Sequence, residues 1–262
     1  MKLNTIYNCD CTYGMSKLPD ECVDLTVTSP PYDNLRKYNG YSWDFEAVAK
    51  QLYRVTKTGG VVVWIVNDAT VNGSETGTSF RQALYFMDCG FNLHDTMIWE
   101  KPSFTATGSL AVRYAPVFEY MFVLSKGKPK TFNPIKDKPN IHAGVKLHGT
   151  LRQKDGTTVG ISGLGKPVAE YGQRHNVWKI SGEMSSKNRV HPAMFPESLV
   201  SDHIISWSNP GDVVLDPFMG SGTTAKMALA NNRYYVGFEI SSEYCEIANR
   251  RIRDFEEQEN QK

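Results

Sequence analysis

The sequence predicts an α/β fold: a doubly wound, mostly parallel sheet with helices on both faces. Short apolar runs alternate with stretches of helical spacing, which is the rhythm of parallel strands joined by crossover helices. Residues 61–66 (Val-Val-Val-Trp-Ile-Val) form an uninterrupted apolar run, typical of a strand buried on both faces. With 262 residues, 40% of them hydrophobic, the chain is long enough for one large domain with a substantial core.

The first half of the chain alternates between strand and helix patterns. Residues 23–27 form an apolar strand that leads into a double proline. Residues 44–57 have apolar side chains at helical spacing, and Thr58-Gly59-Gly60 is expected to end that helix before the strand at 61–66. Residues 79–88 form the next helix, which Cys89-Gly90 ends. Further strands are expected at residues 95–99 and 118–124.

Residues 125–175 lose all apolar periodicity, and the regular pattern returns after Val177. From there a helix is expected at 196–207, a strand at 212–215, a helix at 223–231 and a strand at 234–238. A last helix begins at Ser242 and continues into a charged tail. No internal repeat is visible. We therefore expect one body made of residues 1–125 and 176–262, interrupted by an insert at 126–175.

The net charge of +1 conceals an asymmetry. Residues 126–179 hold eleven lysines and arginines against three acidic residues, a net charge of +8, and the rest of the chain carries −7. A basic, irregular segment is either a solvated loop or a surface that faces phosphates. The chain is therefore expected to be a slightly acidic body with a basic insert.

The five cysteines form no Cys-x-x-Cys pair, and an odd number of them indicates reduced thiols inside a cell. The start of the chain lacks the apolar core of a signal peptide, and the longest strongly apolar run is far too short to span a membrane. The histidines show no spacing typical of metal ligands. We expect a soluble, intracellular protein without a metal site.

Residues 213–224 (Val-Val-Leu-Asp-Pro-Phe-Met-Gly-Ser-Gly-Thr-Thr) combine a strand, a glycine turn and the start of a helix. Gly220 and Gly222 let the backbone approach a ligand closely. The motif is not a P-loop, since the Gly-Lys-Ser/Thr ending is missing, and Ala225 replaces the third glycine of a dinucleotide site. Glu239, at the tip of the next strand, is placed to accept hydrogen bonds from a ribose diol. The alternative is an ordinary turn between strand and helix.

Thr28-Ser29-Pro30-Pro31-Tyr32 forms a second, rigid loop at the carboxyl end of a strand. Ligands gather at such ends in open α/β sheets. A proline carbonyl there can point into a cavity. Taken alone, the segment is equally compatible with a structural turn.

Together the two loops resemble the signature pair of the amino-group DNA methyltransferases, which use S-adenosyl-L-methionine. Residues 8–11, 18–20 and 23–25 resemble the family's opening stretch, and residues 191–197 (His-Pro-Ala-Met-Phe-Pro-Glu) resemble its segment beside the methionine end of the cofactor. Residues 99–102 and 119–126 also fit. The proline loop precedes the glycine loop with a variable segment between them, which resembles the permuted beta class of this family.

The resemblance covers roughly residues 1–125 and 176–250 and implies a seven-stranded methyltransferase sheet, with the basic insert as target-recognition region. The implied catalytic residues are Ser29, Pro30, Pro31 and Tyr32. The implied cofactor-binding residues are Asp10, Cys11, His191, Pro192, Ala193, Phe195, Asp216, Pro217, Phe218, Gly220, Ser221, Gly222, Thr223 and Glu239. Candidate DNA contacts are Arg36, Lys37, Tyr38, Arg152, Lys154 and Arg174.

The implied chemistry needs no covalent nucleophile. The Ser29 hydroxyl and Pro30 carbonyl would accept hydrogen bonds from the amino group of a base, and Tyr32 would stack on a base flipped out of the duplex. Serine before the prolines favours cytosine N4 as target, with adenine N6 as the alternative. Methylation of RNA or of a protein amide, and an inactive cofactor-binding module, are further alternatives.

The resemblance also implies partners and a location. The partner is double-stranded DNA, either within restriction-modification beside a cognate restriction endonuclease or as a solitary enzyme. The protein is expected as a monomer or homodimer in the cytoplasm of a bacterial, archaeal or phage-infected cell.

Overall fold

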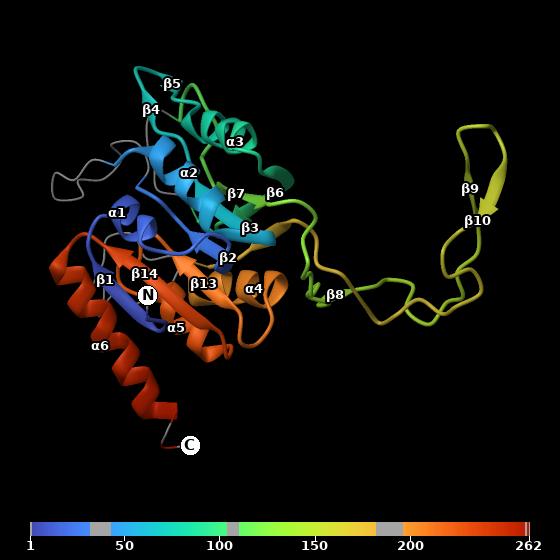
Figure 1. Cartoon of the computed structure of the whole chain (residues 1–262). Coiled ribbons are helices and arrows are strands. Elements are labelled where there is room, and N and C mark those ends of the chain that lie inside the picture. Colours follow the sequence, from blue (N-terminus) through green and yellow to red (C-terminus); the bar gives the residue numbers. More distant parts are fainter. Residues whose placement is uncertain (1, 32–42, 104–109, 182–195, 260, 262) are drawn as a thin grey trace. The chain divides into compact units, whose positions relative to one another are not determined.

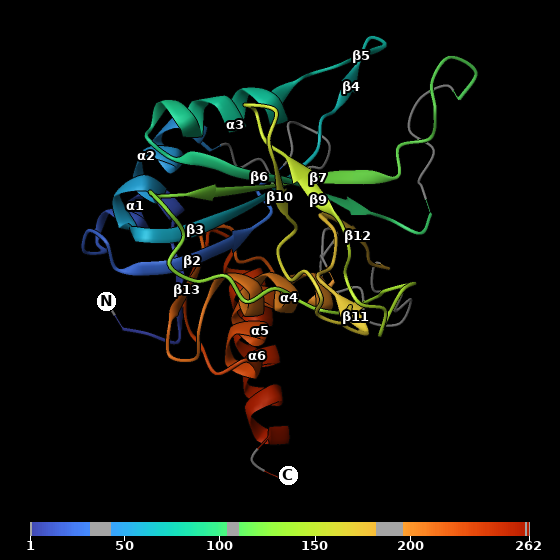
Figure 2. The ribbon, with the colours of Figure 1, turned by 90° about the vertical axis from the view of Figure 1, so that its right-hand side faces the viewer.

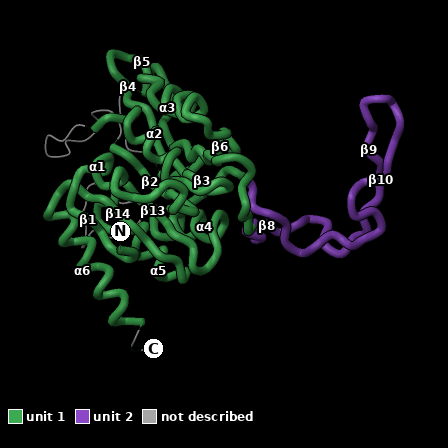
Figure 3. Tube along the Cα trace, in the orientation of Figure 1, with its two compact units in different colours: residues 1–133, 176–262 green, residues 134–175 purple. Residues whose placement is uncertain are grey.

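The computed structural model describes every residue except 1, 32–42, 104–109, 182–195, 260 and 262 (Figure 1). The chain divides into two compact units, shown in Figure 3. We call residues 1–133 together with 176–262 the body, and residues 134–175 the inserted unit.

The body is built on one eight-stranded sheet with the order β1-β14-β13-β2-β3-β7-β6-β12. All neighbouring pairs are parallel except those that involve β7, which runs antiparallel to β3 and to β6. These strands are β1 (Thr5–Asn8), β2 (Val23–Thr28), β3 (Thr56–Val66), β6 (Asn92–Glu100), β7 (Phe118–Ser125), β12 (Val177–Lys179), β13 (Val213–Asp216) and β14 (Tyr234–Glu239). The mostly parallel sheet is confirmed.

The strand count differs from the expected seven. The short strand β12 pairs in parallel with the end of β6, where Trp178 lies opposite Trp99. The Trp99 indole N–H also donates to the carbonyl of Ile180 at 2.9 Å. Three residues that follow an irregular segment carry no detectable period, so the sequence gives no sign of this eighth strand.

Helices cover both faces of the sheet, as predicted (Figure 2). On one face lie α1 (Cys11–Ser16), α2 (Phe45–Val55) and α3 (Thr78–Asp88). On the other lie α4 (Glu197–Trp207), α5 (Thr223–Ala230) and α6 (Ser242–Glu259). A small hairpin of β4 (Thr70–Val71) and β5 (Ser74–Glu75) precedes α3.

The expected stop of the helix at Thr58-Gly59-Gly60 is wrong in detail. The helix ends at Val55, and β3 already begins at Thr56. Gly59 has a φ of +86°, and the pairing of β2 with β3 shifts from Val23–Thr56 to Leu25–Val61. The glycines therefore form an irregularity inside the strand, where left-handed backbone is tolerated.

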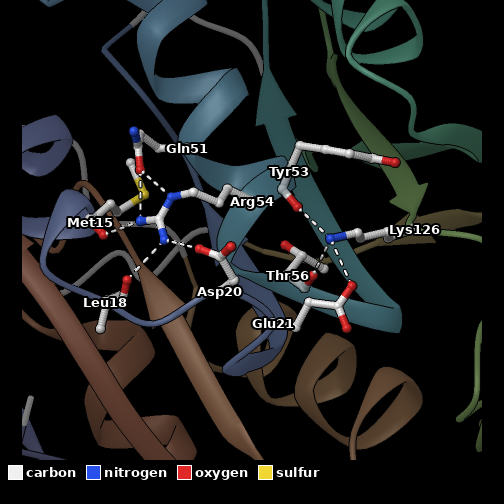
Figure 4. Close-up of polar contacts among 9 residues, drawn as sticks. All are labelled: Met15, Leu18, Asp20, Glu21, Gln51, Tyr53, Arg54, Thr56 and Lys126. Atoms are coloured by element: carbon white, nitrogen blue, oxygen red, sulfur yellow. Dashed lines mark hydrogen bonds and ion pairs between the residues drawn. The ribbon is translucent and has the colours of Figure 1, made fainter.

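A cluster of polar contacts lies at the amino ends of strands β2 and β3, beside the carboxyl ends of α1 and α2 (Figure 4). The Arg54 guanidinium donates to the carbonyls of Met15 at 2.7 Å and Leu18 at 2.9 Å, at the end of α1. Lys126 donates to the carbonyls of Tyr53 and Thr56 at 3.0 and 3.1 Å, where α2 ends. Both cations therefore donate to carbonyls at or just beyond the carboxyl ends of helices, where a positive charge is favourable.

Lys126 belongs to the body, although the charge pattern assigned it to the basic insert. Residues 126–133 are fixed there by backbone hydrogen bonds: Lys126 N donates to Gly60 O at 3.1 Å, Lys130 N to Gly59 O at 3.0 Å, and Asn133 N to Ser206 O at 2.8 Å. The compact inserted unit consequently starts at residue 134.

The inserted unit contains short antiparallel strand pairs joined by turns. β8 (Lys138–Pro139) pairs with β11 (Tyr171–Gly172), and β9 (Thr150–Arg152) pairs with β10 (Thr158–Gly160). None of its residues is buried. It holds seven lysines and arginines against three acidic residues, a net charge of +4. The unit thus exposes basic and polar side chains on a framework that lacks a core of its own.

Candidate active site

The two sequence motifs lie at the carboxyl ends of adjacent parallel strands. β2 ends at Thr28 and leads into the proline loop, while β13 ends at Asp216 and leads into the glycine loop. After β2 the chain continues to α2 on one face of the sheet, and after β13 it continues to α5 on the other (Figure 2). This is a topological switch point, where open α/β sheets bind ligands.

The proline loop begins close to the core. Ser29 is half-buried, Pro30 is buried and Pro31 is half-buried. Tyr32, the fourth predicted catalytic residue, lies outside the described residues, as do the candidate DNA contacts Arg36, Lys37 and Tyr38.

Asp216 is fully enclosed at the junction of the two loops, with 1% of its surface exposed. Its Oδ1 accepts hydrogen bonds from Thr28 Oγ1 at 2.6 Å and from Phe218 N at 2.9 Å, and its Oδ2 accepts one from Thr224 Oγ1 at 2.7 Å. Burial raises the pKa of this carboxyl to about 6, although the three hydrogen bonds oppose that shift. Asp216 therefore joins the end of β2, the glycine loop and the start of α5, and presents little surface to a ligand.

The glycine loop is shaped by Gly220 and Gly222, with φ values of +52° and +84°. A Cβ on Gly222 would lie 2.9 Å from the Cβ of Ala248, so only glycine lets α6 pack this closely. Glu239 is buried and accepts hydrogen bonds from Gly220 N and Ser241 N, both at 2.8 Å. Its pKa is raised because burial outweighs these bonds. Pro217 is buried in the same loop.

The back of the glycine loop rests on a charged cluster from α4, α5 and α6. Arg251 Nη1 donates to Ser221 O at 2.7 Å and Ser221 Oγ at 2.9 Å, and lies 3.4 Å from Thr223 Oγ1. Arg251 Nη2 donates to Glu197 Oε1 at 3.0 Å. Lys226 Nζ donates to both Glu197 oxygens, at 2.7 and 2.9 Å. The loop is thus supported by Arg251, which contacts its backbone and is itself held by Glu197.

Asp10 stands at the same edge of the sheet, just after β1. The strand β1 pairs in parallel with β14, with Asn8 opposite Glu239. Asp10 caps α1 by accepting a hydrogen bond from Tyr13 N at 2.9 Å. Cys11 is buried in the first turn of this helix, and burial raises its pKa to about 12.

The remaining predicted cofactor residues His191, Pro192, Ala193 and Phe195 lie outside the described residues. The described chain resumes at Pro196, just before Glu197 of the charged cluster.

The candidate DNA contacts of the inserted unit differ in their surroundings. Arg152 and Lys154 are exposed in and beside the β9–β10 hairpin. Arg174 forms an ion pair with Asp137, and this contact lowers the pKa of the Asp137 carboxyl. Arg174 therefore supports the fold of the unit in addition to any contact with phosphate.

All five thiols have raised pKa values, chiefly because of burial. Such thiols stay protonated at neutral pH and make poor nucleophiles. Across the described ranges, no group of three or more His, Cys, Asp or Glu side chains could hold a metal ion. Nor does any helix of that part of the chain combine the length and apolar character that crossing a membrane requires.

Four residues of the site escaped the sequence interpretation: Thr28, Thr224, Glu197 and Arg251. Thr28 and Thr224 lie within the two motifs, but the sequence does not reveal that both donate to Asp216, because Thr28 meets this carboxylate only through the neighbouring positions of β2 and β13. Arg251 lies in the charged tail and carries no local signal. The contacts that Thr28 and Arg251 form join segments far apart in the chain, so they depend on how the strands and helices are arranged in the fold.

The residues around the glycine loop suit S-adenosyl-L-methionine. Gly220 and Gly222, both with positive φ, shape the turn between β13 and α5. The Glu239 carboxylate at the end of β14 suits the hydroxyls of a ribose diol, and the Asp10 carboxylate just after the neighbouring β1 suits the amino group of an adenine. Phe218 of the glycine loop packs edge-on against Trp43, with ring centroids 4.9 Å apart.

Fold and site together define a class: open α/β proteins that bind a nucleoside-containing cofactor beside a second, proline-rich ligand loop. Within that class, the chain belongs to the N6/N4 DNA methylase family, whose model matches residues 23–250. Members of this family are methyltransferases that use S-adenosyl-L-methionine, and a solved neighbour of the same fold holds that molecule.

Individual relatives agree with this assignment. The orphan methyltransferase M.BamHII of Bacillus amyloliquefaciens is 56% identical over 243 residues, covering 90% of this chain and 91% of the relative. The DNA adenine methyltransferase YhdJ of Escherichia coli (strain K12) is 30% identical, covering 95% and 82%. The solved PvuII DNA methyltransferase (cytosine-N4-specific) shares the fold with a TM-score of 0.69 at 21% identity, covering 97% of this chain and 91% of that one.

Proposed function

We propose that this protein is a site-specific DNA methyltransferase that methylates the exocyclic amino group of a flipped base, with cytosine N4 as the favoured target. The observation that carries the proposal is the junction at Asp216. There the Ser29-Pro30-Pro31 loop and the glycine loop leave adjacent parallel strands and are joined by hydrogen bonds to one carboxylate.

The base side of the proposed site works through hydrogen-bond acceptors. An exocyclic amino group is a weak nucleophile because its lone pair is delocalised into the ring. The Ser29 hydroxyl and the Pro30 carbonyl would accept its protons and so favour a nitrogen with a freer lone pair. Tyr32 would stack on the extruded base. Ser29→Ala and Tyr32→Ala test these roles directly.

The cofactor side works through shape and charge. When bound, S-adenosyl-L-methionine supplies an activated methyl group, so alignment is the main task of the protein. We assign Asp10 and Glu239 to polar groups of the cofactor, and Phe218 with the backbone of residues 217–223 to its packing. Cys11 and residues 191–193 with Phe195 complete the proposed set. Asp216 and Arg251 act through the loop that they hold.

The target base is proposed as cytosine because Ser29 precedes the two prolines; adenine N6 is the second candidate. The relatives divide: YhdJ is named an adenine methyltransferase and the PvuII enzyme is named cytosine-N4-specific. Sequencing of DNA from cells that express the chain, with detection of modified bases, identifies both base and recognition site. Detection of N6-methyladenine alone would refute the cytosine assignment.

We propose the inserted unit, together with the flanking residues from 126 onward, as the target-recognition region. Its charge of +4 suits phosphates, and its exposed side chains can reach base edges. Arg152 and Lys154 are the foremost candidates, with Arg174, Arg36, Lys37 and Tyr38 as further DNA contacts. The proposed location is the cytoplasm of a bacterial, archaeal or phage-infected cell, because such a cell keeps its duplex DNA there.

A labelled-methyl assay tests the substrate class. Duplex DNA, RNA and protein are offered as acceptors to the full chain with S-adenosyl-L-methionine. Transfer to DNA is expected; transfer to RNA or protein alone, or to no acceptor, would refute the proposal. M.BamHII is named an orphan, and we extend that solitary state to this chain. A restriction endonuclease that cuts the same site and is blocked by the methylation would contradict it.

A further inference from the structure

One buried carboxylate contacts both loops of the proposed site. We propose that Thr28 and Asp216 form a positioning pair that fixes Ser29 and Pro30 relative to the cofactor loop. This inference rests on the proposed function and deepens it. It assigns the alignment of base and methyl donor to two residues that position the loops without contacting base or cofactor.

The strand pairing leaves this junction to side chains. β13 and β2 pair through Val214–Leu25 and Leu215–Thr26, and the register between them ends there. Thr28 lies beyond the last of these pairs. On its other side it pairs with the neighbouring strand β3, where its partner is Trp64. The 2.6 Å bond from Thr28 Oγ1 to Asp216 Oδ1 therefore ties the two strands together where their loops diverge.

A third element is tied in by Thr224, in the first turn of α5. Its Oγ1 lies 2.7 Å from Asp216 Oδ2 and 3.3 Å from the carbonyl of Val27. Phe218 N occupies a second site on Oδ1, at 2.9 Å. Three of the four lone-pair positions of the carboxylate are thus taken by donors from β2, α5 and the glycine loop. Asp216 influences the cofactor through these bonds.

The position of Thr28 in the chain gives the bond its effect. Thr28 is directly bonded to Ser29, and Ser29 to Pro30, the two proposed acceptors for the amino group. Methyl transfer needs the reacting atoms close and in line, and a displacement of about 1 Å can cost about 100-fold in rate. Loss of a hydroxyl anchor one residue upstream is therefore expected to slow the chemical step more than it weakens cofactor binding.

The chain offers a matched control. Thr26 lies two residues earlier, on the same face of β2, and both threonines are fully buried. Thr26 Oγ1 has no hydrogen-bond partner among the described residues. Valine has the same shape as threonine and lacks the hydroxyl. Thr26→Val therefore removes a hydroxyl without a bond, while Thr28→Val removes the bond to Asp216.

The pH dependence adds a readout that a general loss of stability would not move. The groups that face the Asp216 carboxyl are Thr28, Thr224, Phe218 N–H and the Glu239 carboxylate, whose charge raises the Asp216 pKa. The Thr28 bond lowers that pKa. Its removal should move the acid limb of the pH–rate profile to higher pH.

The test compares wild type, Thr28→Val, Thr28→Ser and Thr26→Val as full chains. Single-turnover methyl transfer to duplex DNA is measured across pH, and affinity for S-adenosyl-L-methionine is measured by calorimetry. We expect Thr28→Val to be about 10–100-fold slower, with cofactor affinity within about three-fold of wild type. Thr28→Ser and Thr26→Val should stay within about three-fold of wild type in rate.

Two results would overturn the inference alone: a folded Thr28→Val variant as active as wild type, or equal losses of rate in Thr28→Val and Thr26→Val. A parallel fall of rate, cofactor affinity and melting temperature in Thr28→Val would also overturn it, because that pattern indicates a purely structural role. A wild-type chain that transfers no methyl group to DNA would refute the proposed function instead, and this inference with it.

Discussion

Replacing Arg251 by methionine should weaken cofactor binding about ten-fold, because Arg251 supports the glycine loop from behind. Nη1 donates to Ser221 O at 2.7 Å and to Ser221 Oγ at 2.9 Å, and Nη2 reaches Glu197. Ser221 has 4% of its surface exposed, so water cannot easily replace the lost donor. Methionine keeps most of the length and apolar packing of the side chain and removes all of these bonds.

The magnitude follows from the contacts that are lost. A buried acceptor left without a donor costs about 1–3 kcal/mol. Glu197 adds little to this loss, because Lys226 still donates to both of its oxygens, at 2.7 and 2.9 Å. The loop is therefore expected to lose about 2 kcal/mol of support in the bound conformation. Since a ten-fold change in affinity corresponds to about 1.4 kcal/mol, most of that loss appears as weaker binding.

Calorimetric titration with S-adenosyl-L-methionine measures the effect, with a melting curve of each variant. Arg250 lies on the same helix and is exposed, so Arg250→Met provides the matched control. Arg251→Lys keeps the charge but cannot reach Ser221 and Glu197 together as the guanidinium fork does, and should give an intermediate affinity. Equal affinities of folded Arg251→Met and Arg250→Met would show that the cluster does not support the loop.

Three further predictions concern pH, the proline loop and DNA binding. Burial raises the pKa of Asp216 to about 6, so methyl transfer should fall below about pH 6. A constant rate down to about pH 5 would contradict this loss of activity. Over the same range this carboxyl makes the folded state more stable as the pH falls, because the folded chain binds the proton more tightly than the unfolded chain. Melting curves at each pH therefore separate a loss of activity from unfolding. Ser29→Ala or Tyr32→Ala should abolish transfer while calorimetric cofactor binding persists, and full activity of Tyr32→Ala would refute the catalytic loop. Arg152→Ala combined with Lys154→Ala should weaken duplex binding and reduce the logarithmic salt slope by about 2, measured by anisotropy; an unchanged slope would exclude phosphate contacts.

Local patterns predicted the elements that shape the site. The alternation of apolar runs and helical spacing predicted parallel strands joined by helices, although it did not predict the order of the strands. Gly220 and Gly222 predicted a turn, which the structure confirms through their positive φ values. Short elements escaped: β1, α1 and β12 span too few residues for a period to emerge. The sequence predicts Gly59 at the end of a helix, because a glycine that ends a helix and one inside an irregular strand look alike in sequence.

The charge pattern predicted a basic insert, but it did not predict which of its basic side chains contact the body. The charge pattern predicts Lys126 as part of the basic insert, yet its ammonium donates to carbonyls at the end of α2 and pairs with Glu21 at 3.1 Å. Its partners come from segments far away in the chain, so no window of sequence around it reveals them. A basic side chain in a basic segment is equally suited to a phosphate and to the end of a helix.

The bond between Thr28 and Asp216 shows why the site needs the fold as well as its motifs. The two residues stand 188 positions apart, with the inserted unit between them in the chain. Parallel pairing places the carboxyl ends of β2 and β13 at the same edge, whichever strand comes first. The permuted order of the two loops therefore leaves their geometry intact, provided that these strands remain neighbours. Any change that separates β2 from β13 would keep both motifs and lose the site, which makes the junction at Asp216 the point on which the proposed chemistry depends.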